Sequence, residues 1–423
     1  MTWLLLLVTL LFLVAAHEAG HFLVAKLLGM AVEEFAIGFG PVLLSRRRGE
    51  TRYSLRAFPI GGFVRLAGEE GTSTDVPFER TYYGRPAWVR LLVSLAGPVA
   101  NVVLAGIIAT GALLGFGLPR IQVAGVIPEE PAAQALKLGD VVLSVGGRSI
   151  WLWEDVGPAI QAAAPGPVTF ELIRNGERLE VEIVPKWHPD EGRYLVGAYF
   201  SAQVLLAEVE ELETGSPLWQ AGLRPKDTIA AACGRKVDSL AELYGALEDG
   251  CRNISVIRGE ETVDIALPLL KPDDLLSGAS FRSLPQVVGR PGLGTALELA
   301  GRQVARFFVL LGQVMRGLVR GSIPAGEAVA GPVGMAGILS QGLEAGGLAT
   351  LLLIAFISLN FAAFNLLPFP ALDGARMCFA LFEMVTRRKV SPAVETAIHA
   401  LGFMLLLALM LLVTWRDIMR LFG

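Results

Sequence analysis

The stretch His17-Glu18-Ala19-Gly20-His21 interrupts an almost wholly apolar segment near the start of the chain. Between residues 3 and 16 only Thr9 is polar, and apolar residues resume at 22–25. A run of this length and composition predicts a helix that spans a membrane. Polar and ionisable side chains inside such a helix cost a few kcal/mol each, so they mark a candidate functional site.

The spacing of the motif predicts a metal site. His17 and His21 are four residues apart, so on a helix both imidazoles lie on one face and can bind one tetrahedral ion. Glu18 is placed to accept a proton from a water that the ion activates, as zinc-dependent amide hydrolysis requires. A chance match is the first alternative, although chance matches fall mostly on exposed polar helices.

A secretory signal peptide over residues 1–16 is a second alternative, because Val14-Ala15-Ala16 has the small residues of a cleavage site. No Lys or Arg precedes the apolar core, however, and cleavage after Ala16 would detach the helix that must hold the ligands. We therefore expect the helix to remain part of the protein.

The composition is that of a membrane protein with substantial polar parts. The 423 residues, enough for two or three domains, are 53% hydrophobic and 18% charged. A net charge of −4 without a contiguous basic tract argues against nucleic acid as a partner. Of the three cysteines, Cys233 and Cys251 are expected either to pair in an oxidising compartment or to be free buried thiols. Cys378 stands alone, and no cysteine has the spacing of a metal ligand.

Four segments are expected to cross the membrane, at about residues 3–25, 91–118, 348–367 and 400–413. The segment 297–319 carries too many arginines for a span, and its apolar spacing predicts an amphipathic helix on the outer membrane surface.

The charges of the connecting segments predict the orientation. Basic residues are concentrated in segments 26–90 and 376–389, which the positive-inside rule places in the cytoplasm. Both termini and the long insert, about 120–293, are then periplasmic or extracellular. In a bacterium this describes a multi-pass protein of the cytoplasmic (inner) membrane, with the candidate site toward the cytoplasmic side.

Residues 35–44, 51–56 and 59–64 are apolar, glycine-punctuated strand candidates. Beside a membrane helix they suggest a hairpin that dips into the bilayer, where its edge could pair with an extended substrate. An ordinary sheet on the membrane surface is the alternative.

The insert contains an internal repeat, because the segment 131–140 matches 217–227 and each is followed by strand residues and a Gly-Arg turn. The two copies resemble PDZ domains, in which a strand edge and groove receive a peptide end. Peptide capture and a steric lid over the membrane site are both open as roles.

A third metal ligand is expected from the segment Asn365-Leu366-Leu367-Pro368-Phe369-Pro370-Ala371-Leu372-Asp373-Gly374. The two prolines end a helix there, and Asp373 follows on a turn. Capping of the next helix is the other explanation for Asp373. Asn360 and Asn365 could hydrogen-bond an unwound substrate backbone or orient the loop, and helix–helix contact is the competing account.

Together these motifs resemble the bacterial site-2 protease family of the RseP type, the regulator-of-sigma-E proteases, over nearly the whole chain. The segments that carry the resemblance are HEAGH at 17–21, GFGP at 38–41, PIGGFVRL at 59–66, AGPVAN at 96–101, GPVG at 331–334, NLLPFPALDG at 365–374 and the tandem insert. One departure is Gly374-Ala375, where the family often has two glycines.

The resemblance implies that His17, His21 and Asp373 bind Zn²⁺, that Glu18 is catalytic and that Asn365 contacts substrate. It implies regulated intramembrane proteolysis of single-pass membrane proteins, such as anti-sigma factors and signal-peptide remnants, after another protease has removed the ectodomain. A catalytically silent scaffold that binds envelope peptides through its PDZ-like domains is the main alternative, and a secreted soluble metallopeptidase is a third.

The expected fold is a polytopic α-helical membrane protein with four transmembrane helices, a membrane-associated β-hairpin and two inserted α+β PDZ-like domains. The expected domains are an N-terminal membrane region, the two inserted domains, a linker with amphipathic surface helices and a C-terminal membrane region, at residues 1–119, 120–200, 201–271, 272–345 and 346–423.

Overall fold

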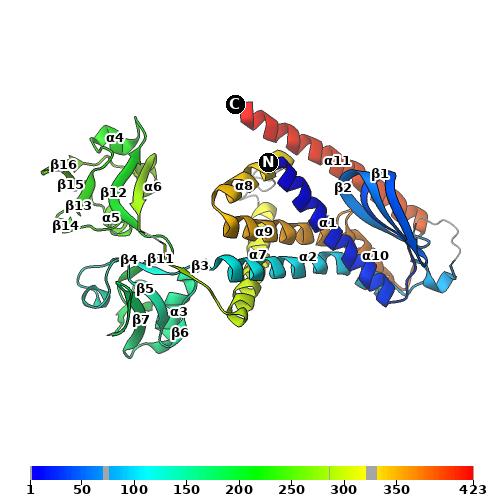
Figure 1. The fold of residues 1–423 in the computed structure, drawn as a ribbon, viewed down its shortest axis with the longest axis horizontal. Coiled ribbons are helices and arrows are strands. Elements are labelled where there is room, and N and C mark those ends of the chain that lie inside the picture. Colours follow the sequence, from blue (N-terminus) through cyan, green and yellow to red (C-terminus); the bar gives the residue numbers. More distant parts are fainter. Residues whose placement is uncertain (1, 70–75, 285, 321–330, 423) are drawn as a thin grey trace. The chain divides into compact units, whose positions relative to one another are not determined.

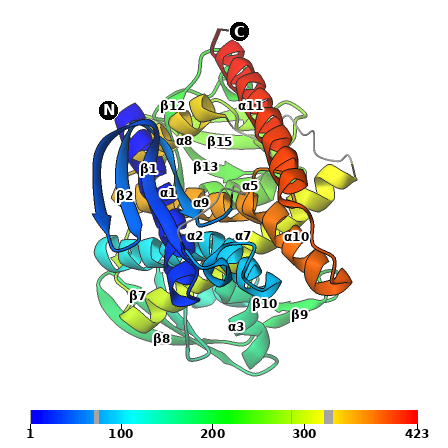
Figure 2. The same cartoon turned by 90° about the vertical axis from the view of Figure 1, so that its right-hand side faces the viewer.

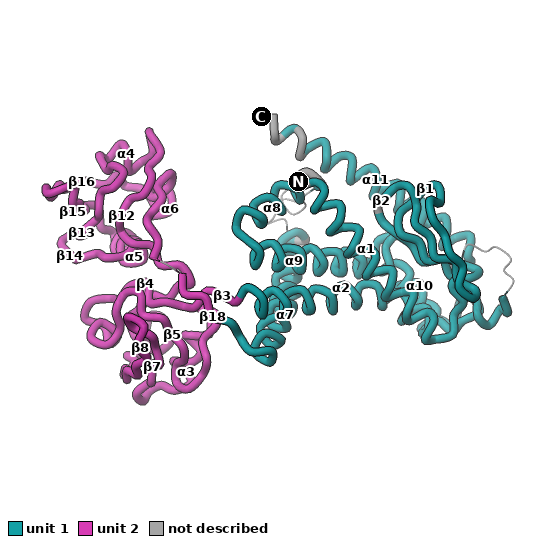
Figure 3. Tube along the Cα trace, viewed as in Figure 1, with its two compact units in different colours: residues 1–116, 290–423 teal, residues 117–289 magenta. Residues whose placement is uncertain are grey.

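The computed structural model describes residues 2–69, 76–284, 286–320 and 331–422. Contacts divide the chain into two compact units (Figures 1 and 3). Unit 1 combines residues 1–116 with 290–423, and unit 2 comprises residues 117–289.

Unit 1 is built on long apolar helices. Over the described residues, four helices are long and apolar enough to cross a membrane, in agreement with the four predicted spans. They are α1 (Thr2–Leu27), α2 (Ala87–Phe116), α9 (Gly347–Leu366) and α11 (Pro392–Phe422). Helix α11 begins well before the predicted 400–413, because Pro392 is suited to the first turn of a helix and the polar residues that follow it are also helical.

Helix α2 lies at the centre of this unit, in contact with α1 and α9. Small residues allow the helices to approach closely: a Cβ on Gly20 of α1 would lie 2.4 Å from the carbonyl oxygen of Ala96 in α2. An apolar cluster that includes Ala105, Phe307 and Leu359 joins α2 to α7 and α9. This packing fixes the position of the motif-bearing helix α1 relative to α2.

The predicted strands between the first two spans form two long bent strands, β1 (Val32–Arg48) and β2 (Thr51–Leu66). Ala36 is paired both with Phe63 and with Ser54, so the two strands make a sheet of four segments. Residues 62–66 have one partner segment, the start of β1, and therefore form an edge of the sheet. Figure 2 shows the sheet alongside α1, and a Cβ on Gly62 would lie 3.3 Å from Val14 of that helix.

Among its described residues, unit 1 also has three further helices and a short 3₁₀ turn, η1. They are α7 (Leu293–Val319), α8 (Pro332–Glu344) and α10 (Asp373–Thr386), and η1 covers Phe78–Arg80. Helix α7 matches the predicted amphipathic helix at 297–319, and Phe307 anchors its apolar face. Part of the expected linker, residues 321–330, lies outside the described residues.

In the described part of unit 2, the two six-stranded sheets have the same connectivity. The first has the order β11-β4-β5-β7-β8 with β6 on β5, and the second has the order β17-β12-β13-β15-β16 with β14 on β13. Each sheet covers a separate apolar core. The elements of the first half are β4 (Gln122–Val126), η2 (Pro131–Gln134), β5 (Val141–Val145), β6 (Arg148–Ser149), η3 (Trp153–Asp155), α3 (Val156–Ala163), β7 (Val168–Arg174), β8 (Glu177–Ile183), β9 (Lys186–His188), β10 (Arg193–Leu195) and β11 (Ala198–Ser201).

The second half continues past the residue 271 at which the sequence placed its end, because β17 pairs with β12. Its elements are β12 (Leu205–Leu212), α4 (Pro217–Ala221), β13 (Thr228–Ala232), β14 (Arg235–Lys236), α5 (Leu240–Glu248), β15 (Asn253–Arg258), β16 (Glu261–Ala266), α6 (Pro272–Leu275) and β17 (Ala279–Ser283). A small ladder of β3 (Leu118–Pro119) and β18 (Val288–Gly289) joins the two ends of the unit.

The internal repeat is visible in matching ion pairs. Arg174 donates to both carboxylate oxygens of Asp140 at 2.8 and 2.6 Å, and Arg258 donates to Asp227 at 2.9 and 2.7 Å. Each aspartate also accepts the backbone N–H three residues before it, at 2.8 Å. The repeated sequence signal is an Asp before a strand and an Arg at the end of a later strand. In both halves these two residues form the same ion pair.

The structure also decides the state of the cysteines. Cys233 and Cys251 form a disulfide with a Cα–Cα distance of 5.8 Å. Cys378, on α10, is a free and exposed thiol.

Candidate metal centre

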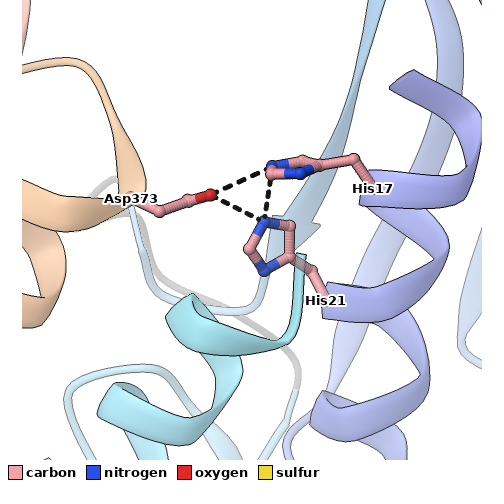
Figure 4. Close-up of side chains that lie close together, drawn as sticks. All are labelled: His17, His21 and Asp373. Atoms are coloured by element: carbon pink, nitrogen blue, oxygen red, sulfur yellow. Dashed lines mark hydrogen bonds and ion pairs between the residues drawn. The ribbon is translucent and has the colours of Figure 1, made fainter. Parts of the chain in front are cut away.

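Asp373 lies beside His17 and His21, although more than 350 residues separate it from them in the chain (Figure 4). The histidines project from successive turns of α1, and Asp373 is the first residue of α10. The Nε2 atoms of the two histidines are 3.2 Å apart. Oδ2 of Asp373 lies 3.0 Å from Nε2 of His17 and 3.2 Å from Nε2 of His21.

This triangle has the size and chemistry of a zinc site. Ligand atoms about 2.0–2.1 Å from a tetrahedral ion are about 3.3 Å from one another, close to the observed separations. Two imidazole nitrogens and one carboxylate oxygen are a donor set of catalytic zinc sites, which leave the fourth position open. The three residues that the sequence predicted as ligands therefore fit the ion.

The ring of His21 is held in the tautomer that a metal requires. Its Nδ1 lies 2.7 Å from the carbonyl oxygen of Val93 in α2, so Nδ1 donates and the lone pair of Nε2 faces the other ligands.

The ring of His17 has a similar partner, Asn101 of α2, which is fully buried. The amide nitrogen of Asn101 is 3.3 Å from Nδ1 of His17, and Oδ1 of Asn101 has no hydrogen-bond partner within the described part of the chain. Turning the amide by 180° places Oδ1 against Nδ1–H, which is the arrangement that a ligating Nε2 needs.

Gly97 of α2 supplies the space for the two rings. A Cβ at this position would lie 2.3 Å from Nε2 of His21 and 2.8 Å from Cε1 of His17. In the sequence, Gly97 and Asn101 stand out only as members of the segment 96–101 that carries the family resemblance. The signal that could have identified Asn101 is its amide in the middle of an apolar span.

Glu18 lines the same cavity as the three candidate ligands, about 500 Å³ in volume. Gly61, Gly62 and Phe63 of β2 also line this cavity. A Cβ on Gly62 would lie 3.4 Å from Cγ of Glu18, so the strand edge and the acid are immediate neighbours.

The two asparagines of α9 have different surroundings. Asn365 lines the cavity of the metal centre, and its amide donates to the carbonyl oxygen of Phe361 at 3.0 Å. Asn360 donates to Phe356 at 2.9 Å and lines a separate, mainly apolar cavity of about 640 Å³ between α2, α7 and α9. The structure thus brings Asn365, and not Asn360, to the metal centre.

Charged residues follow directly on α10. Arg376 forms an ion pair with Glu69 and also lines the metal-centre cavity. Burial acts to lower the pKa of the Arg376 guanidinium, but the Glu69 carboxylate outweighs this and raises it above its usual value. Burial likewise acts to raise the pKa of Asp373, yet His21 and His17 beside it hold that pKa well below its usual range.

A buried His-His-Asp triangle beside a glutamate, within a bundle of four apolar helices, defines the class of the protein: a membrane-embedded metallopeptidase. The chain belongs to peptidase family M50, whose family model matches residues 5–409. The predicted resemblance to site-2 proteases is thereby confirmed. The protein is a zinc metalloprotease, and its metal is Zn²⁺.

Named relatives agree with this assignment along almost their full length. A "Putative zinc metalloprotease" of Thermotoga maritima is 29% identical, with 97% of each chain covered. The zinc metalloprotease RasP of Oceanobacillus iheyensis is 26% identical, again with 97% of each chain covered. Among solved structures, a PDZ domain of an SdrC-like protein from Listeria monocytogenes matches 19% of this chain and 87% of its own length, at 17% identity and a TM-score of 0.18.

Proposed function

We propose that the protein is an endopeptidase that cleaves the membrane-spanning segment of single-pass proteins after their ectodomains have been shed, with anti-sigma factors and signal-peptide remnants as substrates. The observation that carries the proposal is the common cavity of Glu18, the His17-His21-Asp373 triangle and the edge of β2. In the proposal, the triangle binds the metal, Glu18 transfers the proton and the edge of β2 binds the substrate.

In this proposal His17, His21 and Asp373 hold the zinc ion. When bound, Zn²⁺ supplies a Lewis acid that polarises the scissile carbonyl and makes a water molecule acidic. The Glu18 carboxylate accepts a proton from that water molecule while the oxygen of the water forms a bond to the carbonyl carbon. Glu18 then gives the proton to the amide nitrogen as the C–N bond breaks, so the products are a carboxylate and an amine.

The edge of β2 supports the binding of an extended substrate. A helical peptide hides its carbonyl groups in its own hydrogen bonds, and in a bilayer an unwound segment needs other partners for them. Residues 62–66 form a sheet edge directly beside Glu18, where an added strand can make those bonds. Asn365, in the same cavity, is placed to contact the substrate backbone.

The topology belongs to the same proposal. A disulfide between Cys233 and Cys251 forms and persists in an oxidising compartment, which supports a location of unit 2 outside the cytoplasm. The arginine-rich segments 26–90 and 376–389 support the opposite location for the other connections. A location in the inner membrane, with both termini and unit 2 on the side away from the cytoplasm, agrees with both observations.

We also propose that the two halves of unit 2 are PDZ-type domains. Their repeated sheets leave β11 and β17 as edge strands, to which a peptide could add. Peptide capture and exclusion of substrates with intact ectodomains are the two roles to be separated by experiment.

Reconstitution in liposomes tests the proposed activity. The purified protein is mixed with a single-pass substrate that lacks its ectodomain, and cleavage is compared between the wild type and Glu18→Gln. We expect cleavage within the span, slowed by about a hundredfold or more in the variant because general acid–base catalysis is lost. Equal cleavage by both proteins, or none by the zinc-loaded wild type, would overturn the proposal, and the second result would favour a binding scaffold.

A further inference from the structure

The loop before Asp373 has a strained backbone conformation that needs support from outside the loop. Ala371, two residues before the proposed ligand, has a φ of +77°, in the left-handed region that strains a residue with a Cβ. Within the loop, Leu372 N–H donates to the carbonyl oxygen of Phe369 at 3.1 Å. The strained residue itself is held from another helix.

That contact comes from His399 on α11. The N–H of Ala371 donates to Nδ1 of His399 at 2.9 Å, so the proton of this imidazole is on Nε2. The ring also meets the Phe379 ring of α10 edge to face, with centroids 5.9 Å apart. His399 thus touches both the loop before Asp373 and the helix that follows it.

Gly402 provides a second contact between α11 and the loop. It lies three residues after His399 and therefore on the same face of the helix. A Cβ on Gly402 would lie 2.3 Å from Cβ of Pro370 and 2.5 Å from its carbonyl oxygen, so a larger residue would push the helix off the loop.

These contacts matter because the spanning part of α11 is little buried. Its share of buried residues is 11%, against 39% for α2. The loop of Asp373 is one of the contacts that α11 makes within unit 1, beside its packing on α8 and the hydrogen bond from Tyr83 to Glu395.

His399 is not itself placed as a ligand. The cluster of candidate ligand atoms comprises His17, His21 and Asp373. His399 lines a neighbouring cavity of about 590 Å³, together with Arg376 and Glu395. Its effect on the metal centre must pass through the backbone of the loop.

We propose that His399 is a positioning residue, which fixes the carboxylate of Asp373 at the metal centre by accepting the hydrogen bond from Ala371. The inference rests on the proposed ligand set and adds the fourth spanning helix to the structures that determine metal affinity.

The test compares two amide side chains at position 399 in the full-length protein. In His399→Asn the amide oxygen takes the place of Nδ1, whereas in His399→Gln it lies one methylene further out. Zinc affinity is measured by competition with a chelator, and ligand geometry by the visible spectrum of the Co²⁺-substituted protein. We expect Asn to bind zinc within about threefold of the wild type and Gln to bind it about tenfold more weakly, as the loss of a group that orients a ligand does.

Two further variants complete the experiment. Gly402→Ala keeps the histidine but displaces the helix, so it should weaken zinc binding as Gln does. His188→Gln, in unit 2, should leave the affinity unchanged and serves as the matched control.

The outcomes separate this inference from the proposed function. If the wild type binds one zinc ion and His399→Gln binds it equally well, His399 has no positioning role. If Asn is as impaired as Gln, the hydrogen bond is not the cause and the inference is overturned. If the wild type holds no zinc at His17, His21 and Asp373, the proposed site itself is wrong and this inference with it.

Discussion

Gly97 lies so close to His21 that a Cβ on the glycine would be 2.3 Å from the Nε2 atom of the histidine. The space that a methyl group would fill is the space between α2 and the rings of the two proposed zinc ligands, His17 and His21. The ligand geometry therefore depends on a residue that has no side chain.

Gly97→Ala should reduce zinc affinity by about tenfold or more, because the histidine rings must move away from the methyl group. The matched control is Gly106→Ala in the same helix, where a Cβ meets nothing within 4 Å. Alanine favours a helix by about 1 kcal/mol over glycine, so both substitutions should stabilise α2, and a loss of zinc affinity would not result from a weakened helix. Chelator competition measures both variants, and equal affinities would contradict the predicted steric role.

Asp373→Ala should abolish stable zinc binding, because two histidines leave the ion one protein ligand short. Glu18→Gln should retain the metal and lose the activity, because Glu18 is assigned to proton transfer and not to ligation. Metal analysis of the two purified proteins, with cleavage assays alongside, distinguishes the roles. An unchanged zinc content in Asp373→Ala would mean that the third ligand lies elsewhere.

Gly62→Val should slow cleavage of a spanning substrate without loss of zinc. The new side chain would start 2.8 Å from the carbonyl oxygen of Ala36 and 3.4 Å from Cγ of Glu18, and would crowd the proposed substrate edge. Cleavage rate and metal content are measured on the same preparation. Wild-type rates in this variant would remove the edge of β2 from the proposal.

The cysteines give a test of topology. In sealed inner-membrane vesicles without reductant, a maleimide that cannot cross the membrane should label Cys378 when the cytoplasmic face is exposed, and not when the outer face is. Cys233 and Cys251 should react only after reduction, from the outer face, because they are paired. Labelling of Cys378 from the outer face would reverse the proposed orientation.

The buried ion pair of the first repeat should be important for stability. Asp140→Ala removes the carboxylate that accepts two hydrogen bonds from Arg174 and one from a backbone N–H, at a cost of about 3 kcal/mol in the free energy of unfolding of unit 2. Arg178→Ala, which breaks an exposed pair with Glu171, should cost less than about 1 kcal/mol. Hydrogen exchange of β5 and β7 in the full chain measures the loss of stability in both variants. Equal losses would contradict the prediction that the buried ion pair contributes more than the exposed one.

The sequence predicted the local part of the site because its determinants are local. Helical spacing alone puts His17 and His21 on one face of α1. Two prolines, Pro368 and Pro370, are enough to predict that the helix before Asp373 ends there. The repeat in unit 2 was visible for the same reason, since each copy carries its own turn and strand signals. The end of the second copy was not visible, because β17 is recruited by pairing with β12 and has no strong signal of its own.

The amino-acid sequence by itself determined the family, the ligand types and the four apolar helices, since these follow from residue identity and period along one element. Only the tertiary structure decided which groups surround the ligands: Val93 and Gly97 on α2, the edge of β2 beside Glu18, and His399 behind the loop of Asp373. These contacts join elements that are far apart in the chain, and their distances depend on helix packing. For the same reason Asn360 and Asn365, both candidates on one helix, lie in different cavities.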